Sequence, residues 1–400
     1  MKIAHVTPYF HPEFYGSHEA FLSKELARRG HEVVLFTSDR MPRWGGAKGL
    51  SSDSLEVGES TWEGVRVVRI PAGPTVSFLP SLPGLPRRLA AEGWDLCLSH
   101  EVFSLAAWHT ARAARKQGCP FVLVQHGYHS GRRLLFRALF ELEFALFGRG
   151  VLRAADHVVS LTAKGAEFLV ERGADPTKLE VIPTGVACAA FEPRPGLDPS
   201  ALRVGFVGRI ETGKGVFDLV EAIWRANDAL RKRHDRAGGN AAGLPLRVEL
   251  ELVGAGADTE ELERAVAARH LGDRVRVVGR LPHAEVPSFV SGCDVLCVPT
   301  REVEPFGIVA VEAAAAGVPC VATRIGGLVE TVVDGETGVL VEPGDVGGLA
   351  DALVGLATEP DRRAQLGVAA RERALERYDW PRITDRFEAR FKALAASSLA

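Results

Sequence analysis

Two runs of alternating strands and helices, separated by a short break, constrain the fold of this chain more than any other feature. Short β-branched segments such as "HEVVLFTS" and "FVLVQHG" are followed by helical segments almost throughout the 400 residues. Alternation of this kind predicts α/β domains with parallel, doubly wound sheets. Ligands of such sheets bind beyond the carboxyl ends of the strands, so we expect the functional residues in the loops that follow strands.

The break between the two runs suggests a domain boundary. It is the segment 187–200, "ACAAFEPRPGLDPS", which contains three prolines and shows no hydrophobic periodicity. We therefore predict an N-terminal domain over 1–186, a linker over 187–200 and a C-terminal domain over 201–379. The last segment, 380–400, has apolar residues at spacings of three and four, which predict one amphipathic helix. We expect that helix to pack on the N-terminal domain.

Composition and charge argue against several classes of protein. The formal net charge is −3, which does not fit a dedicated nucleic-acid binder. No stretch approaches the roughly 18 apolar residues of a membrane span, and the first residues lack the layout of a signal peptide. The six cysteines have no paired C-x-x-C spacing, so we expect reduced and mostly buried thiols in a cytoplasmic protein, without a metal site.

The segment 206–216, "FVGRIETGKGV", is nearly a nucleotide triphosphate loop. Gly208 and Lys214 fit the Walker A pattern, but Gly215 stands where a Ser or Thr would ligate magnesium. The loop lies between a predicted strand and a predicted helix, so its backbone N–H groups suit an anion. Arg209 and Lys214 add two positive charges that can hold a diphosphate without a metal. A solvated glycine-rich turn is the alternative interpretation of this segment alone.

A second motif, "REVEPFGIVAVEAAAAG" over 301–317, also follows a predicted strand. Glu304 lies in the loop, and Glu312 lies in the first turns of the helix after it. Pro305 and Gly307 shape a tight backbone that brings N–H groups close to a ligand. Carboxylates at these two positions can accept hydrogen bonds from sugar hydroxyls and from a ribose diol. The alternative is a surface loop with both carboxylates in solvent.

Together, "VGRIETGKG" and, about ninety residues later, "EPFGIVAVE" resemble the signature of glycosyltransferase family 4. The resemblance extends over nearly the whole chain and includes "RRGHEVVLFTS", "LEVIPTGV" and "GVPCVATRIGGLVETVVDGETGVLVEPGD". It implies a GT-B fold, in which two Rossmann-like domains face each other across a cleft. It also implies a retaining hexosyltransferase that uses a nucleotide-diphosphate sugar as co-substrate and needs no metal cofactor. The acceptor would be a hydroxyl of a glycan, a glycolipid or a small molecule.

The resemblance also implies roles for single residues. Arg209 and Lys214 would bind the donor diphosphate and stabilise its charge as it leaves. Glu304 would contact the donor sugar, and Glu312 would bind the ribose. His126, at the end of "FVLVQHG", would lie near the reacting sugar. The other implied contacts with phosphates, sugar and base are Gly16, Ser17, Gly208, Gly254, Arg280, Leu281, Pro305, Phe306, Gly307, Ile308 and Val309.

Two departures from the family pattern concern the N-terminal domain and its end. Gly16–Ser17 replaces the usual Gly-Gly, and "TGVA" over 184–187 replaces Asn-Gly-Val-Asp. Among other enzymes, Gly215 disfavours a P-loop ATPase, and "GAGADT" lacks the third glycine of a dinucleotide-binding motif. A nucleotide-sugar epimerase and a non-catalytic protein that binds sugar nucleotides remain as alternatives.

The segment 131–153, "GRRLLFRALFELEFALFGRGVLR", mixes five arginines with many Leu and Phe residues. Such a basic amphipathic stretch can lie on the inner face of a membrane and receive a lipid-linked acceptor. The alternative is a helix that faces the core and keeps its arginines in solvent.

Overall fold

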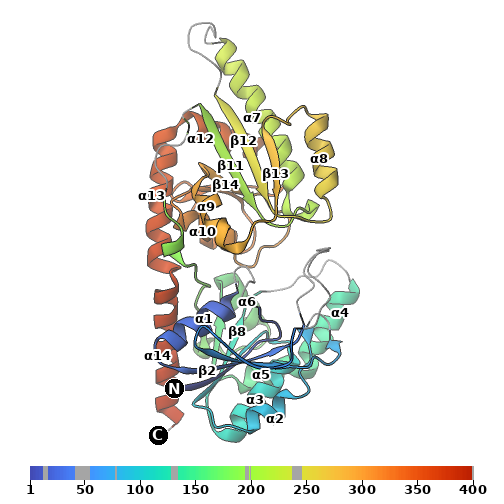
Figure 1. Ribbon diagram of the computed structural model, residues 1–400, viewed down its shortest axis with the longest axis vertical. Helices are drawn as coiled ribbons and strands as arrows, with labels where there is room; N and C mark the ends of the chain where they lie inside the picture. The colour runs from blue at the N-terminus through green and yellow to red at the C-terminus, as the bar shows by residue number, and fades with distance from the viewer. Residues whose placement is uncertain are drawn as a thin grey trace. The chain divides into compact units, whose positions relative to one another are not determined.

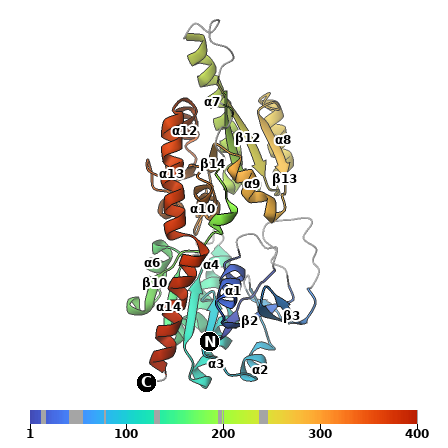
Figure 2. The same ribbon diagram turned by 60° about the vertical axis from the view of Figure 1, so that its left-hand side comes forward.

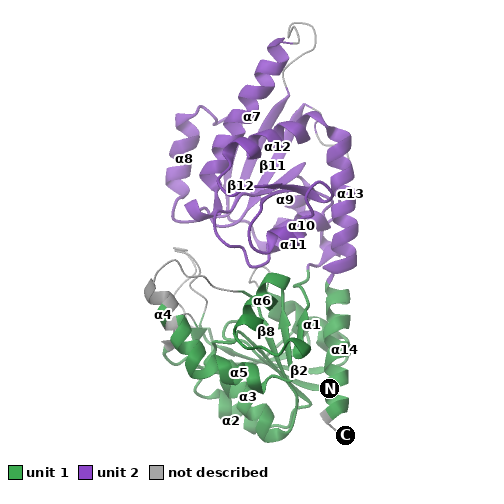
Figure 3. Ribbon diagram, turned by 180° about the vertical axis from the view of Figure 1, so that it is seen from behind, with its two compact units in different colours: residues 1–42, 48–185, 380–400 green, residues 43–47, 186–379 purple. Residues whose placement is uncertain are grey.

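The computed structural model describes residues 1–11, 17–40, 55–76, 79–127, 134–193, 198, 200–236 and 246–398. The chain divides into two compact units, which Figure 3 shows in different colours. Among the described residues, unit 1 takes those up to 185 and those from 380 onward, and unit 2 takes those from 186 to 379.

Unit 1 is built on an eight-stranded sheet with the order β10-β9-β8-β7-β1-β2-β4-β3. Its strands are β1 (Lys2–Val6), β2 (Glu32–Ser38), β3 (Gly58–Trp62), β4 (Val65–Ile70), β7 (Leu96–His100), β8 (Phe121–Gln125), β9 (His157–Ser160) and β10 (Leu179–Val181). The short strands β5 (Thr75–Val76) and β6 (Leu79–Pro80) pair with each other. Neighbouring strands of the large sheet are parallel, except that β3 pairs antiparallel with β4.

The antiparallel edge strand β3 is a difference from the predicted sheet. Its sequence "GESTW" is polar and mostly exposed, so it lacks the hydrophobic run that identifies a buried parallel strand. A two-residue turn joins it to β4, in which Glu63 has a φ of 50° and Gly64 a φ of 81°. Positive φ at both turn residues is typical of the tightest hairpins.

The helices of unit 1 alternate with its strands (Figure 1). They are α1 (His18–Arg28), α2 (Leu85–Ala90), α3 (Leu105–Gln117), α4 (Leu134–Glu143), the π-helical turn η1 (Phe144–Gly148), α5 (Arg149–Ala154), α6 (Ala163–Glu171), the 3₁₀ turn η2 (Pro176–Lys178) and α14 (Trp380–Ser398). Ser17 caps α1 by accepting a hydrogen bond from the N–H of Ala20. Gly30 follows the helix with a φ of 85°.

The C-terminal helix α14 packs on unit 1, which confirms the expectation from its periodicity (Figure 2). One face of the helix is buried and consists of Trp380, Ile383, Phe387 and Phe391. On its other side, Arg29 beyond the end of α1 binds the carboxylates of Asp385 and Glu388 at 2.7 and 2.9 Å. The C-terminal helix is therefore part of the packed structure of unit 1.

Unit 2 contains a six-stranded, wholly parallel sheet with the order β13-β12-β11-β14-β15-β16. Its strands are β11 (Ala201–Val207), β12 (Arg247–Val253), β13 (Val275–Gly279), β14 (Val295–Val298), β15 (Cys320–Thr323) and β16 (Gly338–Val341). Its helices and 3₁₀ turns are η3 (Cys188–Ala190), η4 (Thr212–Lys214), α7 (Val216–Arg236), α8 (Thr259–Ala268), η5 (His283–Glu285), α9 (Val286–Ser291), α10 (Ile308–Ala315), α11 (Leu328–Thr331), α12 (Val346–Thr358) and α13 (Pro360–Arg377).

Both faces of the unit 2 sheet carry a hydrophobic core. Val321 of β15 belongs to the larger cluster, which includes apolar side chains of α7, α8 and α12. The strand neighbours Cys320 and Ala322 belong to a smaller cluster that includes Ala310 of α10 and Leu328 of α11. Successive side chains of a strand point to opposite faces, so the sheet is covered on both sides, as a doubly wound fold requires.

The segment predicted as a linker, 187–200, belongs to unit 2 in its described part. Cys188 and Phe191 are buried, and Val186 just before it forms a bridge with Asp379. All six cysteines are free thiols, and five of them are buried. Among the described residues, no helix is both long and apolar enough to cross a membrane.

The contact of α14 with unit 1 yields a pH-dependent prediction. Hydrogen bonds from Lys392, Arg29 and His31 lower the pKa of Glu388 to about 2. We expect Glu388→Gln to lower the free energy of unfolding by about 1 kcal/mol at pH 7, because the carboxylate is only partly screened by solvent. A carboxyl whose pKa is depressed in the folded protein stabilises the fold at pH values above its unfolded pKa. That stabilisation is lost as the pH falls through the folded pKa, so the difference from the wild type should narrow between about pH 5 and pH 2.

Urea titrations of both proteins at several pH values measure this difference. Glu376→Gln, at an exposed position on α13, is the control and should leave the stability within about 0.5 kcal/mol. A Glu388→Gln effect that stays constant down to pH 3 would contradict the role of this carboxylate.

Candidate active site

Four loops that follow parallel strands form one edge of the unit 2 sheet. Gly208 follows β11, Gly254 follows β12, Arg280 and Leu281 follow β13, and Glu304 lies in the loop after β14. These strands are neighbours in the sheet, so their carboxyl ends lie together. Two of the loops touch directly, because the N–H of Gly254 bonds the carbonyl of Gly279 at 2.8 Å. The structure thus brings together the unit 2 residues that the sequence singled out.

The loop after β11 runs directly into the N-terminus of α7. It forms the 3₁₀ turn η4, and Gly215 then precedes the first residue of α7. The N–H and hydroxyl of Thr212 both bond the carboxylate of Asp258, at 2.6 and 2.7 Å. The N–H of Arg301 bonds the carbonyl of Gly213 at 2.9 Å. Contacts from the loops after β12 and β14 therefore hold the turn in place.

Lys214 and Glu304 form an ion pair between two of these loops. The Nζ of Lys214 lies 2.7 Å from Oε2 of Glu304, and each side chain is 23% exposed. Arg209 bonds Glu211 within its own loop at 2.6 Å. Two cations and two carboxylates thus lie at the edge of the sheet, within reach of solvent. Each cation can exchange its carboxylate partner for a phosphate of a ligand at little cost in free energy, because the cation stays paired with an anion.

Gly215 occupies a position that no residue with a side chain can take without rearrangement. Its φ is +72°, and a Cβ there would lie 1.9 Å from the carbonyl oxygen of Pro299. The loop after β14 thus packs directly on the backbone of the turn. The absence of a Ser or Thr at this position follows from the close packing of two backbones.

The loop from Glu304 to Gly307 is equally tight. Gly307 adopts a φ of 85° as the N-terminal cap of α10. The carbonyl of Glu304 accepts a hydrogen bond from Gly327 at 2.7 Å, and a Cβ on Gly326 would lie 2.3 Å from that carbonyl. The side chain of Phe306 turns inward against Tyr378, with ring centroids 5.9 Å apart. Phe306 can therefore meet a ligand only through its backbone.

Glu312 lies in the second turn of α10 and is only 4% exposed. Burial raises the pKa of this carboxyl well above its usual range. Pro305, Ile308 and Val309, by contrast, are partly exposed. Of the two acids predicted to bind the donor, Glu304 thus reaches solvent and Glu312 is enclosed by the fold.

In unit 1, the predicted residues lie around the start of α1 and the end of β8. Ser17 is the cap of α1 and also bonds Glu19, at 3.2 Å. Gly16 lies outside the described residues. His126 follows β8, as the sequence predicts, and its side chain is 24% exposed. The departure at Thr184 has a structural counterpart, because its hydroxyl bonds Nδ1 of His18 at 3.1 Å.

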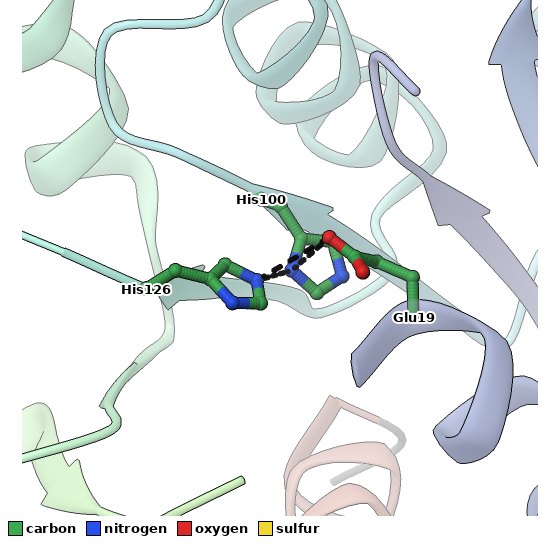
Figure 4. Close-up of side chains that lie close together, drawn as sticks. All are labelled: Glu19, His100 and His126. Atoms are coloured by element: carbon green, nitrogen blue, oxygen red, sulfur yellow. Dashed lines mark hydrogen bonds and ion pairs between the residues drawn. The ribbon is translucent and has the colours of Figure 1, made fainter. Parts of the chain in front are cut away.

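His126 belongs to a group of polar side chains that Figure 4 shows converging from three elements. Nε2 of His126 lies 2.6 Å from Nδ1 of His100 at the end of β7, and 3.5 Å from Oε1 of Glu19 on α1. Nε2 of His100 lies 2.6 Å from Nε2 of His5, whose Nδ1 lies 2.6 Å from the hydroxyl of Ser23. Burial lowers the pKa of His5 to about 3 and lowers the pKa of His100 well below its usual range, so both rings are neutral.

Several residues of both regions were not predicted from the sequence. The acids Glu211 and Asp258 were not assigned, although each lies near the Gly208–Lys214 loop in space. His5, His100 and Glu19 were not assigned either. One signal was available, because a histidine inside the apolar run "KIAHV" and another at the end of "LCLSH" are both polar residues in buried strands.

Known proteins match this chain along both units. The family described as "Glycosyl transferases group 1" matches residues 191–373, and "Glycosyl transferase 4-like domain" matches residues 20–185. The D-inositol 3-phosphate glycosyltransferase of Stackebrandtia nassauensis is 33% identical over 91% of this chain and 83% of its own length. Glycogen synthase of Mycobacterium tuberculosis is 29% identical, over 92% and 88%.

Solved structures share the fold. Sucrose-phosphate synthase from Thermosynechococcus elongatus superposes with a TM-score of 0.74 at 24% identity and covers 99% of each chain. Anabaena HepE in complex with UDP gives a TM-score of 0.73 at 20% identity, over 98% of this chain and 100% of its own. The chain therefore belongs to the glycosyl transferases group 1 family, is a glycosyltransferase and has the GT-B fold. The predicted family and fold class are confirmed.

The packing at Gly215 predicts that the Walker A pattern cannot be restored by mutation. Gly215→Ser should lower the stability of unit 2 by more than about 2 kcal/mol, because the new Cβ meets the carbonyl of Pro299. Gly335→Ser is the matched control, since its φ of +75° is similar but its surroundings are open. The control should lose about 1 kcal/mol from strain alone. Thermal or urea unfolding measures both losses of stability. Equal losses in Gly215→Ser and Gly335→Ser, or a gain of ATP–magnesium binding by Gly215→Ser, would refute this explanation of Gly215.

Proposed function

We propose that the protein transfers a hexose from a nucleotide-diphosphate sugar to an acceptor hydroxyl, with retention of the anomeric configuration. The observation that carries the proposal is the Lys214–Glu304 pair at the carboxyl edge of the sheet. In this pair, a cation that can bind the diphosphate lies within hydrogen-bond distance of a carboxylate that can bind the sugar. A donor bound across this pair would have its scissile bond beside both groups.

In the proposed complex, the donor diphosphate binds Arg209, Lys214 and the N-terminus of α7. The unpaired N–H groups and the dipole of a helix N-terminus favour an anion. The phosphate oxygens would take over Lys214 from Glu304, which would then accept hydrogen bonds from sugar hydroxyls. Glu312 keeps the ribose contact that the family resemblance implies, although it is only 4% exposed. Arg280 and Leu281, after β13, would flank the base, and the backbone at Gly208, Gly254 and 305–309 would complete the pocket.

The charges also indicate how the reaction is promoted. As the bond from the anomeric carbon to the phosphate oxygen breaks, negative charge grows on the diphosphate, and Arg209 and Lys214 stabilise it. The acceptor oxygen forms the new bond on the same face of the sugar, and its proton passes to the leaving phosphate oxygen. Among the residues assigned here, none acts as a covalent nucleophile. Because two side-chain cations compensate the charge, we propose that the step needs no metal ion.

Related proteins suggest the first donor to test. HepE has been solved with UDP and with UDP-glucose, and other family members are named for transfer to inositol phosphate or for glycogen synthesis. We therefore propose UDP-glucose as the first donor candidate. The acceptor class stays a hydroxyl of a glycan, a glycolipid or a small molecule.

The test combines ligand binding with turnover. We expect one of UDP, GDP or ADP to raise the melting temperature more than ATP–magnesium or NAD, and the matching sugar nucleotide to be hydrolysed slowly. Lys214→Ala should lower that turnover about 100- to 1,000-fold, because a group that stabilises transition-state charge is lost. Lys232→Ala, at an exposed lysine on helix α7, is the control and should stay within about twofold.

Other outcomes separate the alternative functions. Binding of a sugar nucleotide without release of its sugar would indicate a non-catalytic binding protein. Interconversion of two donor sugars without transfer would indicate an epimerase. Stabilisation by ATP–magnesium alone would refute the proposal, and unchanged turnover in Lys214→Ala would remove the role assigned to that residue.

We also propose that the protein is cytoplasmic and that the segment 131–153 contacts a membrane. Leu142 on α4 and Leu146 on η1 are one helical turn apart and are 54% and 67% exposed. Arg149 and Arg153 follow on the exposed side of α5, whereas Arg132 and Arg133 lie outside the described residues. Exposed leucines beside basic residues suit the interface of an anionic bilayer.

Vesicle sedimentation tests this contact. The wild type should bind vesicles of phosphatidylglycerol and phosphatidylcholine, and Leu142→Ser with Leu146→Ser should lower the bound fraction at least about threefold. Val368→Ser, at an exposed apolar residue of α13, is the control. No binding by the wild type, or equal binding by the double variant, would exclude this surface as a membrane contact.

A further inference from the structure

A chain of hydrogen bonds runs from a buried serine to His126 at the surface of unit 1. Ser23 on α1 contacts His5 on β1, His5 contacts His100, and His100 contacts His126, with 2.6 Å at each step. Ser23, His5 and His100 are at most 1% exposed. Among the described residues, Nδ1 of His126 at the outer end has no hydrogen-bond partner. The chain thus connects the interior to one ring nitrogen that is available to a ligand.

The residue types also suit a metal ion, because Glu19, His100 and His126 each offer one ligand atom within a small sphere. The distances argue against that interpretation. Two nitrogen ligands of one tetrahedral zinc ion lie roughly 3.3 Å apart, given zinc–nitrogen bonds of about 2.0–2.1 Å. The nitrogens of His100 and His126 are 2.6 Å apart, which matches one hydrogen bond with the proton between them.

A neutral imidazole ring carries one N–H proton. The donors in this row of hydrogen bonds can therefore all face one way or all face the other, so only two arrangements are possible. In the first, His126 donates from Nε2 to His100, His100 donates to His5, and the last proton is donated to Ser23. In the second, Ser23 donates to His5, each ring donates outward, and His126 accepts at Nε2. His126 then carries its own proton on Nδ1. The direction of the chain therefore decides whether the outer nitrogen of His126 donates or accepts a hydrogen bond.

Ser23 selects between the two directions. Within the part of the chain that the structure describes, its hydroxyl has His5 as its hydrogen-bond partner and no other. In the first direction the buried hydroxyl proton would have no acceptor, which costs about 1–3 kcal/mol. In the second direction every buried proton of this hydrogen-bond chain has an acceptor, and only the outer Nδ1–H of His126 is left for a ligand. The carboxylate of Glu19 distinguishes less between the two directions. Its Oε1 lies 3.5 Å from Nε2 of His126 and 3.9 Å from Nδ1 of His100, the two nitrogens that share the proton.

We propose that Ser23, His5 and His100 are positioning residues that hold His126 with its proton on Nδ1, so that it donates a hydrogen bond to an oxygen of the donor sugar or its phosphate. The ligand part of this inference rests on the proposed function and on the family resemblance, which implies that His126 lies near the reacting sugar. The tautomer part concerns this chain's own residues and can be measured without a substrate.

Nitrogen NMR of protein labelled with ¹⁵N-histidine tests the tautomer directly. The chain has 12 histidines, and the signals of His126 can be identified by their loss in His126→Gln. In the wild type at about pH 7.5, we expect the Nδ1–H form to exceed the Nε2–H form at least about fivefold, given the unpaired hydroxyl of the other direction. Ser23→Ala should lower that ratio at least about threefold, although position 23 is three hydrogen bonds away from His126.

Two further variants keep this test specific. Ser99→Ala removes a buried hydroxyl next to His100 that has no partner in the described structure, so it should leave the ratio unchanged. Ser23→Thr restores a hydroxyl and should recover the wild-type ratio. The inference is overturned if His126 is mainly Nε2–H, if Ser23→Ala leaves the ratio unchanged, or if both nitrogens between His100 and His126 lack a proton, as metal ligands would.

Turnover separates this inference from the proposed function. The turnover number of Ser23→Ala should fall in proportion to the Nδ1–H fraction, about 1.3- to 1.7-fold for a ratio that falls from about 5 to between about 1.7 and 1. Ser99→Ala should match the wild type. If the tautomer shifts as expected but turnover does not follow, the tautomer part stands and the assignment of His126 to the donor is wrong.

Discussion

The ion pair between Lys214 and Glu304 depends on the order of strands in the unit 2 sheet. The two residues are 90 positions apart in the chain and 2.7 Å apart in the fold. They meet because β11 and β14 are parallel neighbours, so that the loops after them lie side by side at one edge. The hydrophobic cores on both faces of this sheet hold those strands together. The chemistry proposed for the donor thus rests on a constraint of topology.

Glycines allow the loops at this edge of the sheet to approach one another so closely. At Gly215 and Gly254, a Cβ would meet a backbone carbonyl at 1.9 and 1.8 Å. At Gly326 and Gly327, a Cβ would likewise lie 2.3 and 2.5 Å from the carbonyl oxygens of Glu304 and Pro305. Close backbone packing fixes the backbone positions from which the charged side chains at the rim extend. A diphosphate would therefore meet cations on a backbone that is already in place, which favours stabilisation of developing charge.

The sequence was sufficient to predict the fold class, the family and the strand-end position of His126 and Glu304. Alternation of strands and helices carries that information, because parallel strands are apolar and their loops are polar. The edge strand β3 escaped prediction because "GESTW" has no such signal. The pairing of Lys214 with Glu304 escaped it too, since strand order across a crossover cannot be derived from local pattern. The chain from Ser23 to His126 joins four elements, and each of its histidines appears in the sequence as a single polar residue.

In the proposed mechanism, Arg209 and Lys214 compensate the phosphate charge that a metal ion compensates in a Walker A site. Turnover of the sugar nucleotide that binds best, compared in excess EDTA and in magnesium, tests this role directly. We expect equal rates in the two conditions, and a loss of about 100-fold or more in EDTA when Lys214 is replaced by Ala. Turnover that EDTA abolishes in the wild type and magnesium restores would contradict this role.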